Sequence, residues 1–153
     1  LIHALESCEA NFSARFSNEA AEAVHRVGAL DNRILGLANK FVSNVNSADD
    51  LSRLLQDLEQ ISIAADKIHL DQKSLIGNTN YSALLRIHAG TRLLRASIKS
   101  SLARNESRGV HLRSDFLEEN PELIHHITID KDDNVGTLAV RKGRKDNWIL
   151  SPQ

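Results

Sequence analysis

One short segment, residues 104–116, gathers most of the side chains that could do chemistry. It holds three arginines, one histidine, two acids and one glycine within 13 residues. Arginines beside Glu106 or Asp115 favour charge-assisted hydrogen bonds, and a guanidinium can also donate to the free carbonyls at a helix end. Gly109 can adopt φ > 0 and turn the chain sharply. We interpret residues 104–116, called the latch below, as a charged tie between a helix end and a neighbouring part of the protein; the alternative is a solvated loop.

The sequence lacks the usual patterns of nucleotide-binding, metal-binding and covalent catalytic sites. The glycines do not form a G-x-G-x-x-G or phosphate-loop motif. Of seven histidines, only His125 and His126 are adjacent, and adjacent residues of a strand point to opposite faces. Cys8, the single cysteine, has no feature that marks an activating partner, so we interpret it as a small core residue. We therefore predict no catalytic, cofactor-binding or metal-binding residue in this chain.

Amphipathic helices must position the latch, and four are predicted upstream of it. Apolar residues recur every three or four positions in residues near 3–27, 30–45, 51–68 and 80–104. Ser47 has the features of an N-cap, because Asp49 and Asp50 follow in the first turn. The buried stripe predicted for the last helix is Leu84, Ile87, Thr91, Leu94, Ile98 and Leu102. The expected fold is mainly α, an antiparallel three- to four-helix bundle followed by an irregular segment and a small β-hairpin.

The hairpin is predicted after the latch. Residues 126–130 alternate between apolar and polar, residues 131–134 have turn chemistry, and residues 135–141 form the returning strand. A lone hairpin is marginally stable in water. We therefore expect it to lie on the bundle or on another domain. The tail from Lys142 is polar apart from three residues and is not predicted to form a strand.

Charge is segregated along the chain, although the formal net charge is only −1. Residues 1–66 carry ten acids and five bases, whereas residues 67–104 carry seven bases and one acid. A basic segment of this kind can indicate nucleic-acid binding. The alternative, which we favour, is that a basic helix packs beside an acidic helix of the same bundle.

The composition also bears on the compartment and on the completeness of the chain. No apolar run approaches the 18 residues typical of a membrane-spanning helix. A single cysteine is typical of a reducing, cytoplasmic compartment. The chain begins at Leu1 and contains no methionine, so we expect it to be part of a longer protein.

The latch resembles the E-S-R-G-x-H-x-R-x-D-F/Y-P signature of the flavoprotein subunit of succinate dehydrogenase and fumarate reductase, a family that includes L-aspartate oxidase relatives. The matching residues are Glu106, Ser107, Arg108, Gly109, His111, Arg113, Asp115 and Phe116. Asn78-Thr79 and Leu102-Ala103-Arg104 are similar to the family's N-T-x-L and A-L-A-R, which begin and end the preceding helix. Arg113 favours the succinate/fumarate branch, while Leu117 stands where the family usually has proline.

The resemblance implies the C-terminal domain of such a flavoprotein, with the bundle over residues 1–104 and the latch, hairpin and tail over residues 105–153. In that family FAD lies in an upstream dinucleotide-binding domain. Hydride transfer between FAD and succinate or fumarate there feeds electrons to an iron–sulfur subunit. The chain itself is then expected to be non-catalytic and free of cofactor. It would support the FAD-binding domain, in the cytoplasm or at the inner face of the membrane, without direct membrane insertion.

On this interpretation the latch forms a seam between domains of the parent protein. The family signature residues Glu106–Asp115 would then matter more for that seam than for the stability of this chain. We expect water to reach their ion pairs when the chain is isolated, where an exposed pair contributes only about 0–1 kcal/mol.

A second class of function remains open: a free-standing helical interaction module that binds nucleic acid. The candidate residues are Lys73, Arg86, Arg92, Arg95 and Lys99. Only Tyr81 lies near them in the sequence to stack on bases, and this hypothesis leaves the latch unexplained. The residues upstream of Leu1 would separate the two classes, because a G-x-G-x-x-G after a strand there would indicate the flavoprotein.

Overall fold

The computed structural model describes residues 27–43, 45–68, 70, 78–142 and 148–152. Within them the helices are α2 (Val27–Ser43), α3 (Ala48–Asp66) and α4 (Thr79–Ala103), with a short 3-10 helix η1 (Pro121–Leu123). The strands are β1 (His125–Ile129), β2 (Val135–Lys142) and β3 (Trp148–Pro152). The prediction of a helical bundle followed by a β-hairpin is confirmed. The first predicted helix, with Cys8, lies outside the described residues except for Val27, which already belongs to α2.

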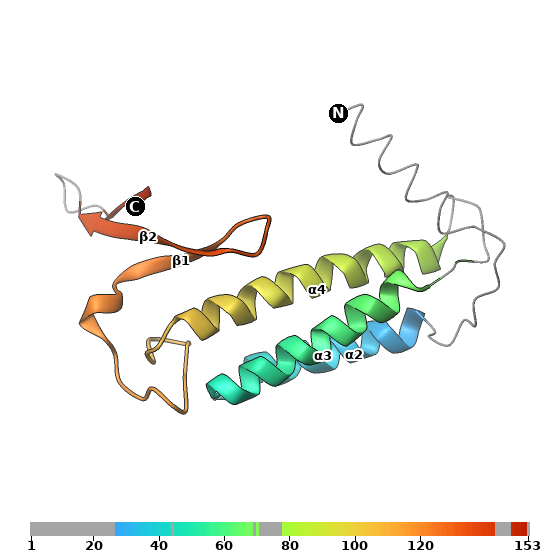
Figure 1. Cartoon of the computed structure of the whole chain (residues 1–153), viewed down its shortest axis with the longest axis horizontal. Coiled ribbons are helices and arrows are strands. Elements are labelled where there is room, and N and C mark those ends of the chain that lie inside the picture. Colours follow the sequence, from blue (N-terminus) through green and yellow to red (C-terminus); the bar gives the residue numbers. More distant parts are fainter. Residues whose placement is uncertain (1–26, 44, 69, 71–77, 143–147, 153) are drawn as a thin grey trace.

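The three helices form a bundle in which each contacts the other two. Figure 1 shows α2 and α4 beginning at the same end of the bundle and α3 running in the opposite direction. The antiparallel sheet has the order β1-β2-β3. Strands β1 and β2 contact α4, on the side away from α3 (Figure 1). The predicted hairpin therefore lies on the bundle, and β3 adds a strand that was not predicted.

The core between the helices is apolar. Ile61, Ile87 and Ile98 have no exposed surface. The predicted stripe of α4 is confirmed, since Leu102 is partly buried and the other five residues are buried. The Thr91 hydroxyl donates to the carbonyl oxygens of Ile87 and His88 at 3.0 and 2.9 Å. Its polar group is therefore satisfied inside the core.

Local capping signals set the helix ends. The Asp50 N–H donates to Ser47 Oγ at 3.2 Å, and the Ser47 N–H donates to the Asp50 carboxylate at 3.0 Å. This capping box confirms Ser47 as the N-cap of α3. Asn78 caps α4, where its side-chain oxygen accepts a first-turn N–H at 2.9 Å. Val45 was predicted on the apolar stripe of the second helix, but α2 ends two residues earlier and Val45 is exposed.

The turn of the hairpin is held against α4 by charge. Lys99 Nζ lies 3.1 Å from Asp133 Oδ2, and Arg95 Nη1 lies 3.7 Å from the same oxygen. Arg95 Nη2 also lies 2.5 Å from Glu59 Oε2 of α3. The prediction that the basic helix packs beside an acidic one is confirmed for Arg95. The hairpin turn supplies a second acidic partner.

Candidate functional site: the latch at the end of the bundle

The latch leaves the end of α4 and reverses through a tight turn at Gly109. The Arg108 N–H donates to the His111 carbonyl at 2.8 Å, and the His111 N–H donates to the Arg108 carbonyl at 3.0 Å. Gly109 has φ +58°, the left-handed conformation in which residues with a Cβ are strained. Ser107 fixes the returning chain, because its Oγ accepts the Arg113 N–H at 2.8 Å. The predicted sharp turn at Gly109 is confirmed.

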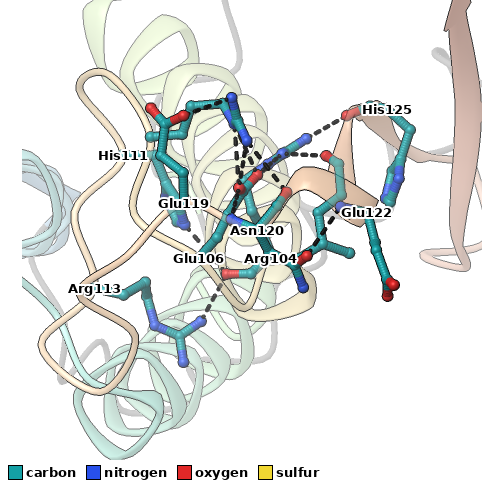
Figure 2. A network of polar contacts seen from close by, with 10 residues as sticks. Arg104, Glu106, His111, Arg113, Glu119, Asn120, Glu122 and His125 are labelled. Carbon is teal, nitrogen blue, oxygen red and sulfur yellow. Dashed lines mark hydrogen bonds and ion pairs between the residues drawn. The ribbon is translucent and has the colours of Figure 1, made fainter.

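Glu106 is the centre of the first of two buried ion clusters (Figure 2). Its side chain is 0% exposed, and its carboxylate lies 2.5 Å from Arg104 Nη1 and 2.9 Å from Arg108 Nη2. The Asn120 N–H also donates to it at 2.9 Å. The hydrogen bonds from Arg108, with those from Asn120 and Arg104, lower the pKa of Glu106 to about 2, although burial opposes this. The carboxylate therefore stays ionised at physiological pH and offers no proton.

The arginines of this cluster reach outward to the elements that follow the latch. Arg104 donates to the carbonyl oxygen of Leu123 at 3.1 Å and to that of His125. Arg108 Nη1 lies 3.0 Å from Glu119 Oε2. The end of α4 is therefore joined through Arg104 to η1 and to the first residue of β1 (Figure 2).

Arg113 is the centre of the second cluster, and its side chain is 1% exposed. Nε and Nη2 donate to the two oxygens of Asp115 at 2.8 and 2.7 Å, and Nη1 donates to the Ser101 carbonyl of α4 at 2.9 Å. The guanidinium carbon lies 5.1 Å from the centre of the Phe116 ring. The Asp115 carboxylate also accepts the Ala48 N–H at the start of α3, at 2.9 Å. Mainly through Arg113, the pKa of Asp115 is lowered to about 2.

The second cluster joins the ends of the three helices. Arg113 contacts the end of α4 and Asp115 contacts the start of α3. The Ser114 N–H donates to the Asn46 carbonyl at 3.2 Å, and Asn46 Nδ2 donates at 2.9 Å to Phe41 in the last turn of α2. The prediction that latch arginines satisfy helix carbonyls and pair with Glu106 or Asp115 is confirmed.

The expectation that water reaches these ion pairs in the isolated chain is wrong for Glu106 and Arg113. Residues of the chain itself cover both side chains. The chain after the latch folds back, so that Asn120 and the start of β1 close over the Glu106 cluster. The helix ends enclose Arg113 in the same way.

The structure brings the family signature residues together, with different degrees of exposure. Ser107 is buried with Glu106 and Arg113, whereas Gly109 is exposed. His111 is half-buried, and its Nε2 lies 3.3 Å from the Arg104 carbonyl oxygen. Sequence reasoning missed the backbone partners that lie outside the end of α4, such as the Asn120 and Ala48 N–H groups, since an N–H or C=O group carries no residue-type signal.

A cleft of about 610 Å³ opens on the sheet side of the latch. Its lining residues are Arg104, Arg108, Val110, His111, Leu123, Ile124, His125 and His126. Val110 is fully exposed and Ile124 is half-exposed. Because Glu106 engages both arginines, the cleft offers apolar and imidazole groups rather than unpaired positive charge.

The described residues were also searched for a metal site, a membrane-spanning helix and a nucleic-acid surface. There, no group of three His, Cys, Asp or Glu residues is arranged to hold a metal ion, and no helix has the length and apolar character to cross a membrane. Of the basic residues considered for nucleic acid, Arg86, Arg95 and Lys99 pair with acids. Arg92 is exposed, and Lys73 lies outside the described residues.

Comparison with known protein families identifies the family of this chain. A family model described as fumarate reductase flavoprotein C-term matches residues 36–149. This chain belongs to the fumarate reductase flavoprotein C-terminal family. The match includes the whole latch, and it confirms the resemblance found in the signature residues.

Solved structures share the fold of this family member. The Sdh1 complex of Mycobacterium smegmatis in its apo form superposes with a TM-score of 0.71, at 16% identity over 100% of this chain. A mutant of the E. coli quinol fumarate reductase FrdA gives a TM-score of 0.69, at 14% identity over 99% of this chain. The chain spans 24% of the length of each of these solved chains. Among curated proteins, no sequence matches it.

Proposed function

We propose that this chain acts as the non-catalytic C-terminal domain of an FAD-dependent flavoprotein of the succinate dehydrogenase/fumarate reductase type. The observation that carries the proposal is that the latch's charged groups are engaged with one another. Glu106 and Arg113 are buried with their partners in place, and the pKa values of Glu106 and Asp115 are about 2. A catalytic site needs groups that are free to bind substrate or move a proton. The charged groups of the latch instead hold the helix ends and the start of β1 together.

The chemistry would belong to the rest of a longer protein. That protein would transfer a hydride between FAD and succinate or fumarate, and pass electrons to an iron–sulfur subunit in a cytoplasmic complex at the inner face of the membrane. Family membership and the quarter-length match to the solved chains support this assignment. We assign no residue of this chain to FAD, because its glycines form no phosphate-binding loop and the latch arginines already bind carboxylates.

The surface that would meet the FAD-binding domain is the cleft on the sheet side of the latch. Val110 stands at the tip of the Gly109 turn, and Ile124 precedes β1 on the same cleft. Apolar side chains exposed beside satisfied charges are typical of an interface. The seam predicted from the signature residues would therefore be formed by the outside of the latch, while its inside stabilises this domain.

Replacing Val110 by aspartate in the full-length protein tests this seam. Val110 is fully exposed, so Val110→Asp should leave the melting temperature of residues 1–153 unchanged. A charge inside the seam should lower the flavin content of the purified full-length protein. Val110→Thr keeps the shape without the charge and is the matched control, with normal flavin content. Normal flavin content in Val110→Asp would contradict the proposal.

A further inference from the structure

The cleft on the sheet side of the latch, called the sheet-side cleft below, is lined by hydrogen-bond donors and apolar side chains. Its donors belong to two arginines and three histidines of the latch and β1: Arg104, Arg108, His111, His125 and His126. The other lining residues are apolar, and within the described part of the chain none of them is an acid. Such a lining is complementary to a group that accepts hydrogen bonds and carries apolar neighbours. Among protein side chains, a carboxylate is the strongest acceptor for these donors.

A cleft between α2 and α3 shows that this lining is specific to the latch. That cleft has a volume of about 420 Å³, and both basic and acidic residues line it: Lys40, Arg53, Asp50 and Asp57. Its cations therefore share the cleft with carboxylates of the same chain. At the sheet-side cleft the Glu106 carboxylate is fully buried and binds Nη1 of Arg104 and Nη2 of Arg108 from the inside. The outward-facing donors are left for a carboxylate from elsewhere.

Two residues can bind an incoming carboxylate. His126 of β1 is exposed, and in the described residues its side chain has no hydrogen bond or ion pair. An imidazole N–H donates to a carboxylate whether the ring is neutral or charged. Arg108 Nη1 lies 3.0 Å from Glu119 Oε2, but the Glu119 side chain is 59% exposed. Because an exposed ion pair is weak, a second carboxylate can replace Glu119 at this nitrogen.

We propose that the FAD-binding domain of the parent protein inserts an Asp or Glu side chain into the sheet-side cleft, where His126 and Arg108 bind its carboxylate. This inference rests on the proposed function, because it states the chemistry of the surface that meets the cleft. Exclusion of water at the seam strengthens these charge-assisted hydrogen bonds. Val110 and Ile124 line the same cleft and contact the apolar neighbours of that acid.

A zero-length cross-link in the full-length flavoprotein, with flavin bound, tests the inference. His126→Lys places a primary amine at the cleft, and a carbodiimide joins an amine to a carboxylate only when the two are in contact. Mass spectrometry of tryptic peptides then identifies the acid. Thr128→Lys is the matched control, because Thr128 is exposed and lies two residues further along the same face of β1, outside the lining of the cleft.

The expected result is a link from position 126 to an Asp or Glu upstream of Leu1, with a yield several-fold higher than from position 128. A link only to Glu119 or Glu122 of this chain, equal yields from the two positions, or no link would overturn the inference. The proposed function would survive these three outcomes if Val110→Asp still lowers the flavin content. A link to a different polypeptide would overturn the inference and the proposed seam together.

A charge reversal at the same position gives a second measurement. His126→Glu places a carboxylate opposite the incoming one, whereas His126→Gln keeps an amide donor of similar size. The flavin retained by the full-length protein after desalting should be several-fold lower for His126→Glu than for His126→Gln. Equal retention in the two variants, alongside flavin loss in Val110→Asp, would overturn the bound carboxylate and leave the seam in place. Circular dichroism checks that both variants keep the fold, which we expect because His126 is exposed.

Discussion

The helical bundle and the latch are both buried, but through opposite chemistry. Ile87 and Ile98 in the bundle have no exposed surface and are apolar, whereas Glu106 and Arg113 in the latch are equally covered and charged. Apolar burial is non-directional and tolerates substitutions that conserve volume. A buried ion pair offsets the desolvation of its charges only when its partners are in place. We infer that the bundle supplies most of the stability, while the latch specifies which ends of the chain meet.

The largest effect is expected when one partner is removed from the latch. Arg113→Ala leaves Asp115 without its guanidinium and removes the donor to the Ser101 carbonyl of α4. The free energy of unfolding should fall by about 3–5 kcal/mol, as for other broken buried pairs. Urea denaturation at pH 7 measures this loss. A loss below about 1 kcal/mol, the range of exposed pairs, would place the latch on the surface.

Acid should act on the latch before it acts on the apolar core. The pKa values of Glu106 and Asp115 are about 2 in the folded chain, below their ordinary values of 4.5 and 3.8. A carboxyl with a lowered folded pKa stabilises the fold above its unfolded pKa and loses that contribution as pH falls through the folded value. Stability should therefore decline between about pH 5 and pH 2.

Urea midpoints at a series of pH values measure this decline. Glu106→Gln should flatten the curve, because glutamine does not titrate. A curve for Glu106→Gln with the slope of the unmodified chain would show that the Glu106 cluster does not control acid stability.

A smaller change in stability is expected at the turn of the latch, and a glycine substitution in α2 that should have the opposite sign is the control. Gly109→Ala should cost about 1–2 kcal/mol, since a Cβ at φ +58° is strained although nothing else lies within 4 Å. Gly36→Ala in α2 also meets open space, and should stabilise the chain by about 0.5–1 kcal/mol because alanine favours a helix interior. Thermal melting of the two variants checks both signs. Loss of stability in Gly36→Ala would contradict the assignment of strain to Gly109 alone.

Shortening a side chain by one methylene compares the two regions directly. Ile98→Val should cost about 0.5–1.5 kcal/mol, the usual loss for a core methyl group. Glu106→Asp removes the same amount of carbon, but the shorter carboxylate cannot reach both arginines and the Asn120 N–H. Its cost should exceed that of Ile98→Val in the same denaturation experiment. Equal costs would mean that the ion cluster adapts as readily as the apolar core.

The smallest effect is expected at an ion pair outside both regions. The Arg86 side chain is 64% exposed where it meets Asp31. Solvent screens such a pair, so Arg86→Ala should leave the urea midpoint unchanged within error. A loss comparable to that of Arg113→Ala would remove the distinction between surface and latch pairs.

Local signals explain what the sequence could predict. Apolar periodicity located α2, α3 and α4, and the spacing of Ser47 and Asp50 located the start of α3. The latch pairs Glu106–Arg108 and Arg113–Asp115 are two residues apart, so they too could be predicted. In each case the interacting groups lie close together in the chain.

Distant backbone groups explain what the sequence could not predict. Glu106 is buried because Asn120 folds back onto it, and Arg104 binds carbonyls 19 and 21 residues away. Asp115 accepts an N–H from Ala48, 67 residues earlier. Strand β3 pairs with β2, although its three apolar residues are adjacent to one another and do not alternate with polar ones. Backbone partners of this kind cannot be recognised from residue types in the sequence. The burial of the latch depends on them.

Amide hydrogen exchange tests most directly whether the latch is a second, polar core. The Arg113 N–H donates to Ser107 Oγ at 2.8 Å, and the Asn120 N–H donates to the Glu106 carboxylate at 2.9 Å. If the latch is a core, both amides should exchange only through global unfolding, with the same opening free energy as the Ile98 amide of α4. Fast, loop-like exchange at Arg113 and Asn120, with Ile98 still protected, would contradict this account.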